Sequence, residues 1–167
     1  MPTAPYTTAR EISTPTEVKE KEQIKVGRMR YSMSKLCNIL CAYELNRQLA
    51  KLGIEHVAVN AFDPGFMPGK DSGLARDYSK VAQFFWRNLM PVVIVFMRNA
   101  HTTATSGSRL ASLAVQDKYA HVTGKYFEGT KQIASSTESY DEDKARDLWQ
   151  TSLELCHLTA EECLFVQ

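Results

Sequence analysis

Two side chains in the first part of the chain combine residue types and a spacing that suit proton transfer. Tyr31 and Lys35 stand four residues apart in the segment Tyr-Ser-Met-Ser-Lys. Residues four apart on a helix project from one face, so a helix would place the phenol beside the ammonium group. A phenol titrates near pH ~10 in water, and a neighbouring cation favours its ionised form. Such a pair could exchange a proton with the oxygen of a carbonyl that receives a hydride.

The elements around this pair alternate between helix and strand. Apolar residues recur at helical spacing over residues 31–52, which predicts a long amphipathic helix that starts near the pair and ends at Gly53. Taken alone, the pair fits a helix start with an exposed lysine better than a catalytic pair. Residues 54–62 are rich in β-branched side chains and predict a buried strand before Asp63-Pro64-Gly65. A helix, a glycine turn and a buried strand form one step of a parallel α/β fold.

Further elements are expected downstream of this strand. Prolines and glycines over residues 64–73 predict an irregular loop, and open α/β sheets bind ligands in the loops after their strands. The apolar residues 83–99 predict two helical pieces that are interrupted at Pro91. Boundaries and periodicity predict a helix over residues 102–116, a short strand over 124–128 and a helix over 141–157. Ser139 or Asp141 would cap the last of these helices.

The motif and its surroundings resemble a known family. The segment Tyr-Ser-Met-Ser-Lys-Leu-Cys-Asn, the long helix, the strand and Asp63-Pro64-Gly65 are similar to the Tyr-x-x-x-Lys helix and the Pro-Gly loop of the short-chain dehydrogenase/reductase family. The Ser-Lys-Leu-x-Asn continuation and the terminal helix most resemble the branch that contains protochlorophyllide reductase and retinol dehydrogenases. The resemblance covers residues 24–158, which is most of the chain.

The resemblance implies a fold and an activity. The fold would be α/β, namely the C-terminal half of a Rossmann-type doubly wound parallel sheet. It would be rich in helices and retain two parallel strands, at residues 54–62 and 124–128. The activity would be that of an oxidoreductase that transfers hydride between NAD or NADP and a small carbonyl or alcohol substrate. Residues 68–99 would cover the substrate.

The resemblance also assigns roles to individual residues. Tyr31 would donate or accept the proton. Lys35 would orient the Tyr31 side chain and hydrogen-bond the nicotinamide ribose. Pro64 and Gly65 would belong to the loop that passes over the nicotinamide. Met67 lies near a position that contacts the cofactor in many relatives. We therefore expect Tyr31, Lys35, Pro64, Gly65 and Met67 to form the cofactor site.

The chain departs from the family pattern in the part that binds the cofactor phosphates. Family members carry a Thr-Gly-x-x-x-Gly-x-Gly loop, and none of the 8 glycines here stands in such an array. The family serine would stand near Val18 and Lys19, and Ser13 is the nearest serine upstream of them. We expect the catalytic serine to be missing along with the N-terminal nucleotide-binding half. A second hypothesis therefore stays open, in which the chain is a catalytically incompetent remnant that acts as a dimerising or protein-interaction module.

The organisation that these patterns favour has three parts. Residues 1–28 are expected to form a surface loop or insertion, residues 29–158 the dehydrogenase-like part, and residues 159–167 a tail. The missing strands would leave a sheet edge and helix faces uncovered. We therefore expect the chain to form a homo-oligomer.

Composition excludes several other classes of function. The 167 residues contain 20 Lys and Arg against 19 Asp and Glu, and a net charge of +1 argues against nucleic acid as a partner. The 4 histidines and 4 cysteines lack the spacing of metal ligands, so no metal site is expected, and the cysteines are expected to be buried reduced thiols. The apolar stretches are too short for a membrane-spanning helix, and membrane contact is not expected. The N-terminus has no apolar region typical of a secretory signal, so we expect a cytoplasmic protein.

Overall fold

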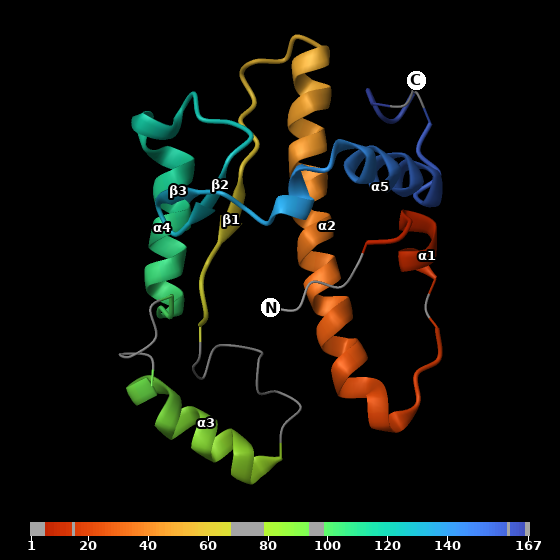
Figure 1. The fold of residues 1–167 in the computed structure, drawn as a ribbon. Coiled ribbons are helices and arrows are strands. Elements are labelled where there is room, and N and C mark those ends of the chain that lie inside the picture. Colours follow the sequence, from red (N-terminus) through yellow and green to blue (C-terminus); the bar gives the residue numbers. More distant parts are fainter. Residues whose placement is uncertain (1–5, 15, 68–78, 94–98, 160, 166–167) are drawn as a thin grey trace. The chain divides into compact units, whose positions relative to one another are not determined.

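A computed structural model of the chain describes residues 6–14, 16–67, 79–93, 99–159 and 161–165. The chain forms two compact units. Unit 1 contains Met1–Ala61, Thr123–Lys125 and Ala134–Gln167, and unit 2 contains Phe62–Val122 and Tyr126–Ile133. Figure 1 shows the elements of both units, which are described separately below. No helix among the described residues is both long enough and apolar enough to span a bilayer.

Unit 1 is built around one long helix. This helix, α2 (Gln23–Lys51), packs against α5 (Glu142–Leu155), and the short helix α1 (Ala9–Ser13) packs against α5 as well (Figure 1). Two short 3-10 helices, η1 (Glu20–Glu22) and η5 (Thr137–Tyr140), contact α2. Unit 1 therefore joins segments from widely separated parts of the sequence.

The core of unit 1 lies where α1, α2 and α5 meet. Leu40 of α2 and Ala145 of α5 are 0% exposed. The rest of the buried cluster consists of Tyr6, Ala9, Met33, Leu36 and Leu148, with Ile12, Met29, Cys37 and Cys41 packed against it. The members on α2 recur every three or four residues, so one face of α2 is buried and the opposite face stays exposed.

The N-terminal segment is part of this core. Tyr6 is 7% exposed and Ala9 is 4% exposed, although both residues fall within the expected surface loop. The Tyr6 hydroxyl and the Ala9 N–H both donate to Asp147 Oδ2, at 2.8 and 2.7 Å. The expectation of a surface loop is therefore wrong for these two residues, because an acceptor on α5 holds them in place.

The long helix begins earlier than expected. The sequence predicts a start near Tyr31, whereas α2 begins at Gln23, so the pair at Tyr31 lies within the helix and not at its start. Residues 23–30 are mostly Lys, Arg, Met, Ile and Val. Lys, Arg and Met have a high helix propensity, but these eight residues show no apolar period, so periodicity does not reveal the helix start. The helix ends as predicted, with Gly53 in the left-handed conformation (φ +69°) after the last turn.

The sheet contains three short strands. These are β1 (Ala61–Asp63), β2 (Tyr126–Glu128) and β3 (Lys131–Ile133), in the order β1-β2-β3. The Ala61 N–H donates to the Lys125 carbonyl at 2.8 Å and the Gly129 N–H to the Asp63 carbonyl at 3.2 Å, so β1 and β2 run parallel. The predicted pair of parallel strands is confirmed. The antiparallel pairing of β2 with β3 makes the sheet mixed and was not predicted.

The first strand is shorter than the sequence predicts. Residues 54–62 were expected to form it, but regular strand covers only Ala61–Asp63. Before β1, Val59 accepts from the Gly124 N–H at 2.7 Å, while the Val59 N–H is bound by the Thr123 side chain at 2.9 Å. A side chain thus replaces part of the ladder, which ends the regular pairing.

Two longer helices belong to unit 2. Helix α3 (Lys80–Val93) runs through Pro91, so the expected interruption at this proline is wrong within the described residues. Helix α4 (Thr103–Val115) matches the prediction, and the Thr102 hydroxyl caps it by accepting from the Thr105 N–H at 3.1 Å. The 3-10 helix η4 (Asp117–Tyr119) follows, and the Tyr119 ring packs edge-on against Phe127, which is 2% exposed.

The last helix also matches the prediction within two residues at its C-terminal end. Asp141, one of the two expected caps of α5, accepts from the Asp143 and Lys144 N–H groups at 3.1 Å each. The hydroxyl of Ser139, the other expected cap, donates to the Ser136 carbonyl at 2.6 Å. Asp141 is therefore the cap. The observed combination of helices with a small mixed sheet places the chain in the α/β class.

The cysteines are free, but they are not all buried. Cys37, Cys41 and Cys163 are partly buried, while Cys156 is exposed. The expectation of buried thiols is therefore wrong for Cys156, which follows the last residue of α5.

Candidate functional site

Tyr31 and Lys35 lie together on the exposed face of α2. The Lys35 Nζ atom is 5.3 Å from the centroid of the Tyr31 ring, which is within the range of a cation–π contact. Tyr31 is 52% exposed and Lys35 is exposed too. Among the residues that the structure describes, neither the phenol oxygen nor the ammonium group has a hydrogen-bond or ion-pair partner.

The buried face of α2 fixes the orientation of this pair. Met33 and Leu36, on the same turns, are 7% and 9% exposed and belong to the core of unit 1. The Ser34 hydroxyl donates to the Tyr31 carbonyl at 2.8 Å, which is a contact within the helix. The helix is thus anchored on one side, and this leaves Tyr31 and Lys35 on the other side.

Pro64, Gly65 and Met67 lie in one loop of unit 2, directly after β1. The Gly65 N–H donates to Asp63 Oδ1 at 2.8 Å. Gly65 has φ +76°, and a Cβ atom there would lie 2.6 Å from Asn99 Oδ1, so only glycine fits. Met67 is partly buried at the end of the described part of this loop.

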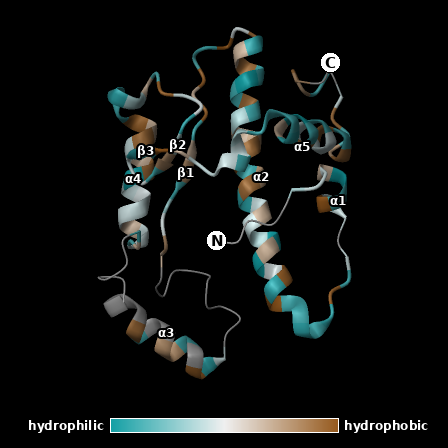
Figure 2. Cartoon of the chain, viewed as in Figure 1, coloured by the Kyte–Doolittle hydropathy of each residue, from teal (hydrophilic) through white to brown (hydrophobic). Residues whose placement is uncertain are grey.

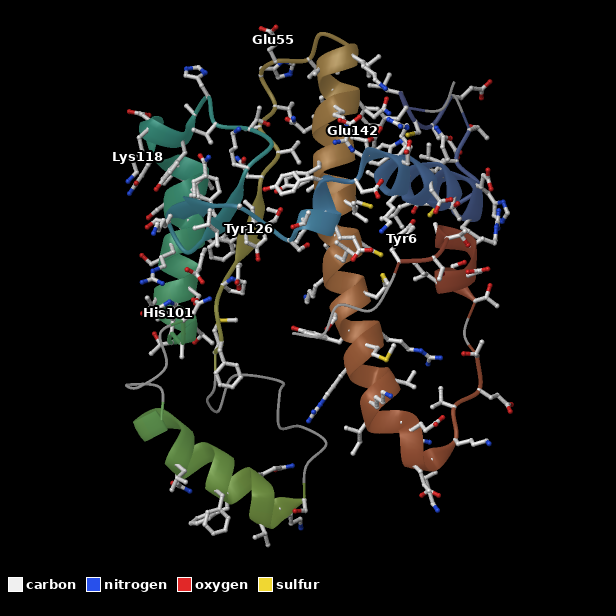
Figure 3. All side chains as sticks on the ribbon, in the orientation of Figure 1. Tyr6, Glu55, His101, Lys118, Tyr126 and Glu142 are labelled. Carbon is white, nitrogen blue, oxygen red and sulfur yellow. The ribbon has the colours of Figure 1, made fainter. Side chains whose placement is uncertain are left out.

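A short bridge connects this loop to the residues that precede α4. The Phe66 N–H donates to the Asn99 carbonyl at 2.8 Å, and the His101 N–H donates to the Phe66 carbonyl at 2.9 Å. His101 lies at the N-terminal end of α4 (Figure 3). The structure thus brings Tyr31 together with Lys35 in unit 1, and it brings the three loop residues together in unit 2.

Ser13, the nearest serine upstream of the position expected for the family serine, is the last residue of α1. Its hydroxyl donates to the Arg10 carbonyl at 2.8 Å. This hydroxyl therefore makes a hydrogen bond within the last turn of a short helix. The expected substrate-covering segment, residues 68–99, is described only in part, and its residues 68–78 and 94–98 lie outside the described residues.

A cluster of hydroxyl groups in unit 1 escaped the sequence reasoning. The Tyr43 hydroxyl lies 2.9 Å from Ser135 Oγ, which lies 2.6 Å from Ser139 Oγ, and the Ser135 N–H donates to the Tyr140 hydroxyl at 3.1 Å. Burial raises the pKa of Tyr43, while hydrogen bonds from Ser135 lower the pKa of Tyr140. The two rings stack at 5.4 Å. No local signal predicts this cluster, because it joins α2 to η5 across more than 90 residues.

A pocket of about 330 Å³ lies between α2, α5 and the segment after α5. Its lining consists of Glu44, Gln48, Lys51, Arg146, Trp149, Gln150, Leu153, Glu154, Leu158 and Phe165. Glu44 is 1% exposed and accepts from the Arg47 Nε–H at 2.8 Å and from the Gln48 amide at 2.6 Å. The buried carboxylate is thus paired within α2, as a buried charge must be. Neither Tyr31 nor Lys35 lines this pocket.

Within the described residues, no group of three or more His, Cys, Asp or Glu side chains is placed to hold a metal ion. Unit 1 therefore offers one phenol and one ammonium group. Unit 2, taken by itself, offers a loop with a glycine of fixed conformation.

Comparison with known proteins identifies relatives. The chain matches the family model of the AcuH dehydrogenase domain over residues 73–165, a range that does not include Tyr31 or Lys35. Retinol dehydrogenase 13 of Homo sapiens is 35% identical over 133 residues, which is 78% of this chain and 37% of that protein. The Mus musculus protein of the same name is 32% identical over 134 residues, covering 77% of this chain and 36% of the relative. Short-chain dehydrogenase TIC 32 A, chloroplastic, of Brassica napus is 30% identical over 129 residues, covering 75% of this chain and 36% of the relative. The chain thus spans little more than a third of the length of these relatives.

Proposed function

Because the chain belongs to the short-chain dehydrogenase/reductase family, we propose that it supplies the proton-transfer residues of an oxidoreductase that acts on a carbonyl or alcohol with NAD or NADP. The observation that carries this proposal is the geometry on α2. An exposed phenol lies with an ammonium group 5.3 Å from its ring centroid, and both stand on a face that the core leaves open.

The chemistry of the pair follows from its two groups. When a carbonyl is reduced, its carbon gains the hydride and its oxygen takes the proton of the Tyr31 hydroxyl. When an alcohol is oxidised, its carbon gives up a hydride to the oxidised cofactor, and the deprotonated Tyr31 oxygen takes the proton of the alcohol hydroxyl. The Lys35 ammonium group stabilises negative charge that develops on the phenol oxygen during either transfer. Because Tyr31 is half-exposed, solvent can return or remove the proton after turnover.

The residues fit one end of the cofactor. When bound, NAD or NADP supplies or accepts the hydride. Lys35 has three N–H donors and Tyr31 one O–H donor, a set that suits the hydroxyl groups of the nicotinamide ribose. The phosphates are a different matter, since the sequence has no glycine array and the space over Gly65 is occupied by Asn99. We therefore expect that the cofactor phosphates are not held by a glycine-rich loop of this chain and that other residues bind them.

The first test is a fluorescence titration of NADPH and NADH into the full 167-residue chain. Saturable binding supports the proposal, and turnover is then screened with aldehydes and ketones by following NADPH consumption. Tyr31→Phe should reduce turnover by about 10²–10⁴-fold and leave the circular dichroism spectrum unchanged. Tyr140→Phe is the matched control, because Tyr140 is also 52% exposed. Substantial turnover by Tyr31→Phe contradicts the role of the pair.

A second candidate function is an interaction module, and exposed apolar side chains favour it. On α3, Val81, Phe84 and Leu89 are 68%, 64% and 57% exposed, and they lie along one stripe with Phe85 (57%). Figure 2 shows strongly hydrophobic residues along this helix. Exposed apolar patches of this kind mark association surfaces. We propose that a second copy of the chain covers this stripe.

A further inference from the structure

Ser106 of α4 makes a contact that ties two distant parts of unit 2 together. The residue is 3% exposed, and its hydroxyl donates to the Pro64 carbonyl at 2.7 Å, across 42 residues of sequence. A buried hydroxyl needs a partner, because leaving it unpaired costs the energy of removing it from water. Here the partner is the residue immediately before Gly65 in the predicted cofactor loop.

The Pro64–Gly65 peptide is held at both of its polar atoms. Its carbonyl oxygen accepts from the Ser106 hydroxyl, and its N–H donates to Asp63 Oδ1 at 2.8 Å. Asn99 closes the space beside Gly65, where a Cβ atom would lie 2.8 Å from the Asn99 carbonyl oxygen. The peptide plane can therefore not rotate without breaking a hydrogen bond or moving Asn99.

We propose that Ser106 is a positioning residue of the cofactor loop. By fixing the Pro64 carbonyl, it sets the plane of the Pro64–Gly65 peptide and thus the conformation in which the loop meets the nicotinamide. This inference rests on the proposed function for its ligand. The contact itself rests only on distances and burial within unit 2.

The test compares Ser106→Ala with Ser112→Ala in the full chain. Ser112 lies on the same helix, and its hydroxyl donates to the Ser108 carbonyl at 2.9 Å, so its loss affects only α4. Backbone hydrogen exchange is measured at Gly65 and Phe66, and NADPH binding is measured by fluorescence. The loop keeps its backbone hydrogen bonds in Ser106→Ala, so we expect both variants to fold.

Ser106→Ala should speed exchange at Gly65 and Phe66 about three- to tenfold and weaken NADPH binding by a similar factor. If the chain turns over a substrate, the KM for NADPH should rise while kcat changes less. Ser112→Ala should leave all of these values unchanged. If Ser106 had a purely structural role, Ser106→Ala would lower the melting temperature without weakening NADPH binding or raising the KM for NADPH.

The outcomes separate this inference from the proposed function. If the unchanged chain binds NADPH and Ser106→Ala binds it equally well, the positioning role is wrong. Unchanged exchange at Gly65 in Ser106→Ala also overturns it, whether or not NADPH binds. If the unchanged chain binds neither NADPH nor NADH, the proposed function fails, and the role of Ser106 toward the nicotinamide fails with it.

Discussion

The surroundings of the Tyr6 phenol change its acidity. Burial is the main cause that raises the pKa of Tyr6 above its ordinary value of 10.0, and the hydrogen bond and the charge of Asp147 add to it. The folded chain therefore favours the neutral phenol. The stability that this gives is fully present below pH 10.0 and is lost as the pH rises above that value toward the raised pKa.

This shift predicts a difference at alkaline pH. The free energy of unfolding of the unchanged chain should fall more steeply above pH ~10 than that of Tyr6→Phe, which has no phenol to ionise. At neutral pH, Tyr6→Phe should cost about 1–3 kcal/mol, because Asp147 loses a hydrogen-bond donor. Urea unfolding between pH 7 and pH ~11 measures both effects. Equal pH slopes for the two proteins would contradict the assignment.

The cysteines should react in an order set by burial. Burial raises the pKa of Cys37 and of Cys41, and the Glu44 carboxylate raises that of Cys41 further. Because the thiolate is the reactive form, both thiols should react with iodoacetamide at neutral pH more slowly than exposed Cys156. Peptide mass spectrometry over a time course gives the order. Labelling in urea is the control, since unfolding should remove the difference.

At the same scale, only part of the candidate site could be predicted from the sequence. Tyr31 and Lys35 are four residues apart, and a helix converts that spacing directly into proximity. Ser106 and Asn99 could not be found in this way. Their contacts with Pro64 and Gly65 depend on how the chain returns to β1 after α3, and no local pattern encodes that path.

Among the elements, the packing of α2 on α5 should carry much of the stability of unit 1. Leu40 is 0% exposed at this contact, so Leu40→Ala removes buried methyl groups and leaves a cavity. We expect the free energy of unfolding in urea to fall by about 2–5 kcal/mol. Leu155→Ala, at the 45% exposed end of α5, should cost much less. Similar losses for both variants would show that the core does not lie here.

The helices were predicted better than the strands, and the reason is physical. Helices α4 and α5 show a local apolar period and a capping residue, so their bounds follow from nearby sequence. Strand β3 has the sequence Lys-Gln-Ile, which carries no strand pattern of its own. It is a strand only because the turn after Glu128 places Lys131 opposite that residue. Register of this kind comes from the partner strand.

At the scale of the whole molecule, the apolar stripe of α3 predicts self-association. Sedimentation at micromolar concentration should give a mass of at least twice 18.8 kDa. Phe84→Gln combined with Phe85→Gln should shift the chain toward monomer, because these side chains are more than half exposed. Lys80→Gln on the same helix is the control. A monomer for the unchanged chain would remove the support for this candidate function.

The division into two units could not be predicted from local sequence patterns either. The sequence predicted consecutive segments, whereas unit 1 combines Met1–Ala61, Thr123–Lys125 and Ala134–Gln167. Hydrophobic periodicity says which face of a helix is buried, but it does not say which distant segment covers that face. The N-terminal residues carry few apolar anchors, and their place in the core depends on Asp147.

The bond between Tyr6 and Asp147 joins residues 141 positions apart, and this has a consequence for synthesis on the ribosome. Tyr6 emerges before its partner Asp147 on α5, which does not exist until all of unit 2 has been translated. Until then, the apolar face of α2 has no cover and is open to chaperones and proteases. Translation that stalls before α5 would thus leave this apolar face exposed, and packing of α5 with its Asp147 would cover it.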